Sequence, residues 1–155
     1  MLRKTTIHMK KIYLLLFICT AFCYSQNKKE AIVGTWKAVD YSGVENKMVF
    51  SVDNYVSMNI NGEFLDGKNL VIKNAKGVDE KGFLKYEIDD SELPFKIDII
   101  ITKIENNKAV EKGRLMGILE FLNQDEAKIN LGISGKREAA FNDSNKETTI
   151  RLQRN

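Results

Sequence analysis

After residue 25 the sequence contains no cysteine and no histidine. Both cysteines, Cys19 and Cys23, and the single histidine, His8, fall within the first 25 residues. Residues 26–155 therefore lack a thiol nucleophile, an imidazole base and any disulfide, together with the ligands of most zinc and copper sites. This absence excludes most cysteine-dependent and histidine-dependent catalysis from that part of the chain.

The first 25 residues have the three parts of a secretory signal peptide. A basic stretch contains four Lys and Arg residues and no acidic residue, an apolar run covers residues 12–22, and small side chains follow at Cys23 and Ser25. The run is shorter than the roughly 20 residues that a membrane-spanning helix needs. We therefore expect no transmembrane segment, translation from Met1 or Met9, cleavage after Ser25, and export to the periplasm or out of the cell.

A lipoprotein is the alternative interpretation of this leader. A lipid-modified cysteine normally follows a small residue, whereas Cys19 follows Ile18 and Cys23 follows Phe22. Cleavage without lipidation is the expectation that fits these neighbours better.

Charge is balanced once the leader is set aside. The leader holds four of the 24 basic residues and none of the 21 acidic ones, so residues 26–155 carry 20 basic and 21 acidic residues, a net charge of about −1. A nucleic-acid-binding protein needs a concentrated basic face, and none is visible in the sequence. We expect residues 26–155 to fold as one monomeric domain that does not bind nucleic acid.

Proline is also scarce, and apolar residues recur at every second position, a period that predicts antiparallel strands. Pro94 is the only proline. The clearest alternation runs through residues 84–89 and 95–102, where only Ile100 breaks the polar face. The other predicted strands are residues 35–41, 47–51, 55–60, 69–73, 115–122, 127–133 and 148–154.

The connections between these strands are short and rich in turn residues. Asn61-Gly62 and Asp66-Gly67 are the strongest hairpin signals, and Asn54, Asn106-Asn107 and residues 123–126 mark further turns. No connection is long enough for a crossover helix. The sequence therefore predicts an all-β, antiparallel, up-and-down β-barrel of about eight or nine strands, with a short helical turn at residues 27–33 across one end.

The triplet Gly34-Thr35-Trp36 opens the first predicted strand and resembles the start of the lipocalin and lipocalin-like barrels. The later segments 85–89, 97–98, 117–120, 128–131, 135–136 and 150–152 follow in an order that resembles an uncharacterised family of small exported bacterial proteins with a lipocalin-like fold. The resemblance covers nearly all of residues 26–155. It implies a cup-shaped barrel whose relatives often hold small apolar molecules, and it brings no catalytic residues.

The same resemblance implies a structural role for Gly34 and Trp36 at the closed end of the barrel. In lipocalins the tryptophan lies beneath a basic side chain from near the C-terminus. Arg154, which shares a strand face with Ile150 and Leu152, is the candidate for this cation contact, and Arg151 is the alternative.

The predicted inner face carries large side chains, which either fill the barrel or line a cavity for one small ligand. Candidate ligand-binding residues are Met48, Met58, Tyr86, Ile97 and Phe121. Two functions stay open: an exported binding protein for a small hydrophobic or amphipathic ligand, and a structural or protein-interaction domain of the cell envelope with a filled barrel.

Carboxylates are the remaining candidates for catalysis, because two of them suffice for glycoside hydrolysis. Asp89, Asp90 and Glu92 cluster beside Ser91 where a predicted strand ends, a pattern typical of a solvated turn. The spaced ligands and central glycine of a calcium loop are missing there. We expect a protein that is not an enzyme and holds no metal or cofactor.

Overall fold

The computed structural model describes residues 28–60, 62–74, 76–132 and 135–155. The chain divides into two compact units, Met1–Ala31 and Ile32–Asn155. Helix α2 (Lys28–Ala31) is the described part of the first unit. The expected signal peptide and its cleavage site lie outside the described residues. Among the residues that are described, no helix has the length and apolar character needed to cross a membrane.

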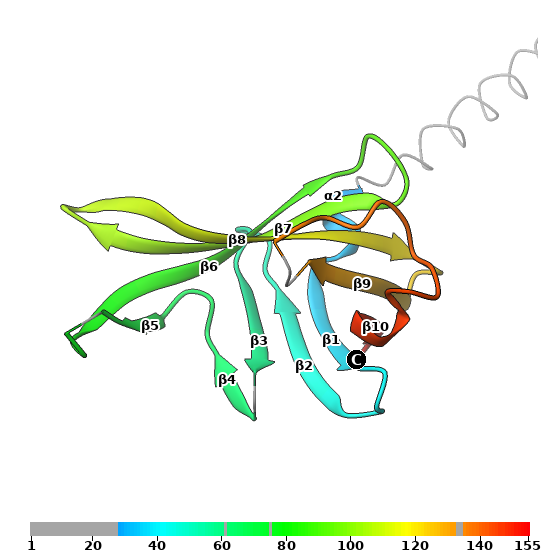
Figure 1. Ribbon diagram of the computed structural model, residues 1–155, viewed down its shortest axis with the longest axis horizontal. Helices are drawn as coiled ribbons and strands as arrows, with labels where there is room; N and C mark the ends of the chain where they lie inside the picture. Colours follow the sequence, from blue (N-terminus) through cyan, green and yellow to red (C-terminus); the bar gives the residue numbers. More distant parts are fainter. Residues whose placement is uncertain (1–27, 61, 75, 133–134) are drawn as a thin grey trace, which may run out of the picture. The chain divides into compact units, whose positions relative to one another are not determined.

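The second unit is all-β, and its described residues form ten strands, where eight or nine were expected (Figure 1). The additional strand is β4, three residues between the two glycine-containing turns. A short 3₁₀ helix, η1 (Lys146–Thr148), precedes the last strand. The strands are β1 (Gly34–Val39), β2 (Glu45–Phe50), β3 (Val56–Ile60), β4 (Glu63–Leu65), β5 (Leu70–Lys73), β6 (Asp79–Asp89), β7 (Phe95–Glu105), β8 (Lys108–Phe121), β9 (Glu126–Gly132) and β10 (Thr149–Arg154).

The ten strands form one antiparallel sheet in the order β4-β3-β2-β1-β10-β9-β8-β7-β6-β5. Strands that follow each other in the sequence are neighbours throughout, except that β4 and β5 do not pair, and β1 pairs with β10. This is the predicted up-and-down connectivity. The sheet curls into a nearly closed barrel.

The barrel comes closest to closing where β3 approaches β6. Tyr55 and Lys85 form an isolated antiparallel bridge, and the amide of Leu84 donates to the carbonyl oxygen of Gly67 at 2.9 Å. A side chain at Gly67 would collide with the carbonyl oxygen of Val56, so only glycine allows this close approach. Gly67, which was predicted as a turn residue, therefore also makes possible the contact between β3 and β6 that nearly closes the barrel. We call this contact the seam.

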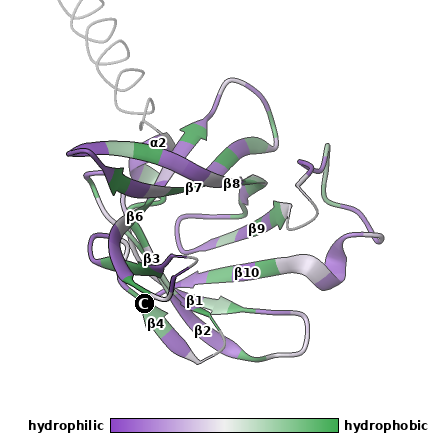
Figure 2. Cartoon of the chain, turned by 60° about the vertical axis from the view of Figure 1, so that its left-hand side comes forward, coloured by the Kyte–Doolittle hydropathy of each residue, from purple (hydrophilic) through white to green (hydrophobic). Residues whose placement is uncertain are grey.

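Alternation of hydrophobic and hydrophilic residues along the strands places one face of the sheet inside the barrel (Figure 2). The fully buried side chains of this inner face include the aromatic and branched residues Trp36, Phe50, Val56, Ile97, Ile99, Leu119, Ile129 and Leu152. Their burial supplies the main hydrophobic stabilisation of the unit.

Strands β6, β7 and β8 extend beyond the barrel, to the left in Figure 1. The pairing of β7 with β8 shifts between Ile101 and Thr102, where Lys112 is the additional residue of a β-bulge. Past the bulge, the face of β7 that continues the barrel interior carries the charged residues Lys103 and Glu105, and Lys103 forms ion pairs with Glu80 and with Glu105. The apolar alternation ends here, which explains why both strands are longer than predicted.

The outer face of β7, β8 and β9 is covered by residues 135–148, which we call the covering segment. The side chain of Arg137 donates to the carbonyl oxygen of Gly117 at 2.6 Å, and Nδ2 of Asn130 donates to Oγ1 of Thr148 at 2.8 Å. Asn130 and Ile118 are buried although they point away from the barrel interior. The sheet is thus buried on both faces in this region, where the sequence pattern indicated a solvated outer face.

Candidate functional site

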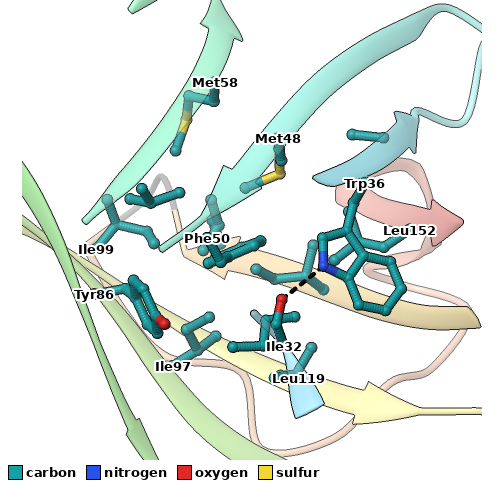
Figure 3. Packing of buried hydrophobic residues seen from close by; sticks show 14 of the residues in the cluster. Ile32, Trp36, Met48, Phe50, Met58, Tyr86, Ile97, Ile99, Leu119 and Leu152 are labelled. Atoms are coloured by element: carbon teal, nitrogen blue, oxygen red, sulfur yellow. Dashed lines mark hydrogen bonds between the residues drawn. The ribbon is translucent and has the colours of Figure 1, made fainter. Parts of the chain in front are cut away.

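The barrel interior is the first candidate site, because four of the five predicted ligand-binding residues lie buried within it (Figure 3). Met48 and Met58 are direct cross-strand partners on β2 and β3. Tyr86 comes from β6 and Ile97 from β7, and both belong to the same hydrophobic core. Phe121, at the end of β8, is half-buried and packs against that core.

A small pocket opens beside two of these predicted residues. It has a volume of about 70 Å³. Met48 and Met58 line it, while Tyr86, Ile97 and Phe121 do not. Pockets for drug-sized ligands usually measure about 300–1,000 Å³. The remaining lining residues are Ala38, Asp40, Asn46, Asn59, Leu131 and Ile150.

The polar tip of Tyr86 is already engaged by the protein. Its hydroxyl donates a hydrogen bond to the carbonyl oxygen of Ser51 at 2.9 Å, and its ring meets that of Phe50 edge to face, with centroids 5.2 Å apart. Burial raises the pKa of the Tyr86 phenol, with a smaller contribution from the charge of Asp53. Tyr86 is therefore a packed core residue whose hydroxyl donor is used by Ser51.

Ile97 and Phe121 lie apart from the methionine pocket. Ile97 is fully buried on β7, opposite Gly117 of β8. The ring of Phe121 packs against Phe95, with centroids 6.2 Å apart. The five predicted residues thus share one core but do not surround one cavity.

Trp36 is fully buried in the core of the barrel. Its Nε1 donates to the carbonyl oxygen of Ile32 at 2.7 Å (Figure 3). The guanidinium carbon of Arg154 lies 4.3 Å from the centre of the Trp36 ring, in a cation–π contact. The basic side chain over the tryptophan is therefore Arg154, and the alternative, Arg151, points to the other face of β10.

Gly34 makes room for this arrangement. Its φ of +135° is in a region that residues with a side chain rarely adopt, and an added Cβ would lie 2.9 Å from Nη1 of Arg154. The same Nη1 donates to the carbonyl oxygen of Val33 at 3.0 Å. Glycine, tryptophan and arginine therefore form one packed unit.

The acidic residues named as catalytic candidates lie in an exposed turn. Lys96 forms ion pairs with Glu92 and, at 3.9 Å, with Asp89, and the amide of Ser91 donates to Oδ1 of Asp89 at 3.0 Å. Within the described residues, no group of three or more acidic, histidine or cysteine side chains is placed to hold a metal ion. These contacts fit the predicted solvated turn.

A larger groove lies on the outer face of β1, β10 and β9. Its volume is about 410 Å³. Of its lining residues only Arg151 was considered from the sequence, as the alternative to Arg154 in the contact with Trp36. Alternation along β10 was the available signal, because it points Arg151 outward between Ile150 and Leu152. The lining residues are Val39, Asp40, Tyr41, Leu122, Lys128, Lys146, Thr149 and Arg151.

Comparison of the chain with family models, curated proteins and solved structures finds no significant match. The packed barrel interior and the outer groove are therefore the observations from which a function is inferred.

Proposed function

We propose that this chain is an exported, lipocalin-like binding module without catalytic activity, which meets its partners through its outer surface. In this proposal the barrel interior is a packed core, and the module belongs to the cell envelope as an interaction domain. The leader-like residues 1–25 support export.

Two features support the lipocalin-like assignment. The triplet Gly34-Thr35-Trp36 opens β1, and the tryptophan lies under Arg154 from the last strand. The up-and-down order of strands and the pairing of β1 with β10 fit the same type of barrel.

The filled interior is the observation that carries the proposed mode of action. The pocket beside Met48 and Met58 measures about 70 Å³, and the surrounding inner-face side chains are buried in one cluster. A ligand of ordinary size would have to displace several of these side chains, which costs free energy because protein interiors are close-packed.

An interior ligand remains the second candidate function, and the methionine pair is the observation that favours it. Methionine side chains are unbranched and adapt their shape. Rotation of Met48 and Met58 would enlarge the pocket that they line.

Titration with a fluorescent fatty acid, combined with native mass spectrometry of protein purified from its own envelope, separates these two functions. We expect no co-purified ligand, and no fatty-acid binding below about 100 µM that depends on the pocket beside Met48 and Met58. The matched variant is Met58→Phe, which fills the pocket with a stiffer side chain. Binding tighter than about 100 µM that Met58→Phe abolishes would replace the proposed function by the interior-ligand function.

A further inference from the structure

The outer groove brings together two cations on adjacent strands. Arg151 of β10 is the direct cross-strand partner of Val39 on β1 and of Lys128 on β9. All three side chains point to the outer face. Like charges placed directly opposite each other in a sheet destabilise it. An anion between them would relieve this repulsion.

Protein carboxylates neutralise this group of cations only in part. Lys128 forms an ion pair with Glu120 at 3.0 Å. Among the residues that the structure describes, neither Arg151 nor Lys146 has a carboxylate within 4.0 Å, and Nζ of Lys146 lies 6.0 Å from the centroid of the Tyr41 ring. The groove therefore offers two cationic groups, Arg151 and Lys146, that are free to bind an anion.

Asp40 is the acidic residue that lines the groove, and its carboxylate accepts hydrogen bonds from its own loop. Oδ1 of Asp40 accepts hydrogen bonds from Oγ of Ser42 at 2.7 Å and from the amide of Val44 at 3.0 Å. These bonds, that of Ser42 above all, hold the pKa of Asp40 below its usual value. Asp40 thus stabilises the turn after β1 and does not pair with Arg151.

The rest of the groove is apolar and accessible. Tyr41 is 60% exposed and Leu122 is 48% exposed, and Val39 also lines the groove. The groove volume of about 410 Å³ is within the usual range for small-molecule sites, about 300–1,000 Å³. Apolar surface next to unpaired cations matches a ligand that has an apolar body and an anionic group.

We infer that this groove binds a small amphipathic carboxylate, a molecule with an alkyl or aryl body and one carboxylate group. The carboxylate lies between Arg151 and Lys146, where the guanidinium donates two parallel hydrogen bonds. The apolar body contacts Val39, Tyr41 and Leu122. This inference rests on the proposed function, because it assumes that ligands meet the outer surface of the barrel.

Nuclear magnetic resonance titration of the isotope-labelled chain, produced from the full sequence, tests the site with a matched pair of probes. Naphthoate has an aryl body and a carboxylate, and naphthamide has the same body without the charge. We expect naphthoate to shift the amide signals of Val39, Tyr41, Thr149 and Arg151 with a dissociation constant below about 1 mM, and naphthamide to bind at least about tenfold more weakly.

Three variants identify the charges involved. Arg151→Gln and Lys146→Gln should each weaken naphthoate binding, Arg151→Gln by at least about tenfold because it removes the bidentate donor. Lys108→Gln is the control, because it removes one exposed positive charge at the β7–β8 hairpin, away from the groove. The affinity of the Lys108→Gln variant for naphthoate should equal that of the unaltered chain. Because the side chains of Arg151 and Lys146 are exposed, we expect both variants to fold like the unaltered chain.

The possible failures are distinguishable. Equal binding of naphthoate and naphthamide, no shifts at the groove up to about 1 mM, or an unchanged affinity in Arg151→Gln overturns the anion site alone. Shifts centred on Met48 and Met58 overturn the proposed function as well, because they show that the ligand enters the barrel.

Discussion

Arg137 and Asp98 join the covering segment to the sheet: Nη2 of Arg137 donates to Oδ1 of Asp98 at 2.7 Å. The other carboxylate oxygen of Asp98 accepts a hydrogen bond from Nη1 of Arg114 at 2.8 Å. Nη1 of Arg137 also donates to the carbonyl oxygen of Gly117. One guanidinium thus holds residues 135–148 against two neighbouring strands, β7 and β8.

Replacing Arg137 should loosen this attachment. Arg137→Leu removes charge-assisted hydrogen bonds and leaves the carbonyl oxygen of Gly117 without this donor, so we expect the free energy of unfolding to fall by about 1–3 kcal/mol. Arg137→Lys should recover only part of the loss, because lysine lacks the planar fork. Denaturant unfolding measures the change. Lys136→Leu, at the exposed neighbouring position, is the control, and an equal loss in both variants would contradict the attachment.

Trp36 should be among the most costly side chains to truncate. Trp36→Ala empties a fully buried site and removes the donor to Ile32, so the free energy of unfolding should fall by about 3–5 kcal/mol. The exposed Val52, at 81% exposure, provides the control variant Val52→Ala, whose stability should stay within about 0.5 kcal/mol. A loss below about 1 kcal/mol for Trp36→Ala would show that the surroundings of Trp36 are not packed as described.

The seam between β3 and β6 makes Gly67 sensitive to substitution. Gly67→Ala places a methyl group against the backbone of Val56, so we expect a loss of about 1–3 kcal/mol in the free energy of unfolding. Gly113→Ala is the matched control, because its Cβ would lie 3.6 Å from Cδ1 of Ile101, an ordinary contact. Thermal unfolding of both variants provides the comparison. Equal melting temperatures would mean that the seam tolerates displacement.

Tyr86 should give the protein a stability that decreases in alkaline solution. Burial raises the pKa of its phenol above the ordinary value of 10.0, so the folded state favours the neutral form. This contribution is fully present below about pH 10 and is lost as the pH rises through the raised pKa of the folded state. The free energy of unfolding, measured in denaturant from pH 9 to pH 11, should therefore fall less steeply in Tyr86→Phe than in the unaltered chain.

Tyr41→Phe is the control for this measurement, because the Tyr41 ring is 60% exposed. It should retain the alkaline decrease. If Tyr86→Phe retains it too, the phenol of Tyr86 is not the group responsible.

Period-two alternation was sufficient to predict most of the barrel, because a sheet with one buried face imposes that period directly. The same alternation placed Arg154 on the inner face of β10 and Arg151 on the outer face, because successive residues of a strand point to opposite faces. Strand β4 was missed because three residues between two turns are too few to show a period. The outer ends of β7 and β8 were missed because charged pairs, such as Lys103 with Glu105, replace the apolar face there.

The outer groove could not be predicted from local pattern. Lys146 comes from a 3₁₀ helix and Tyr41 from the turn after β1, and only the tertiary fold brings them beside Arg151. The filled interior was equally beyond the sequence, because a packed barrel and a hollow one use the same alternation and differ only in side-chain volume and rotamer.

The pairing of β1 with β10 has a consequence for how the barrel assembles. Arg154 bonds to Val33 across 121 residues of sequence, so this contact closes the longest loop in the barrel and slows folding. A circular permutant that joins residue 155 to residue 32 and opens the chain between Asn106 and Asn107 would turn that distant pairing into a local hairpin. The same barrel should then form faster, with the β7–β8 pairing as the new late step.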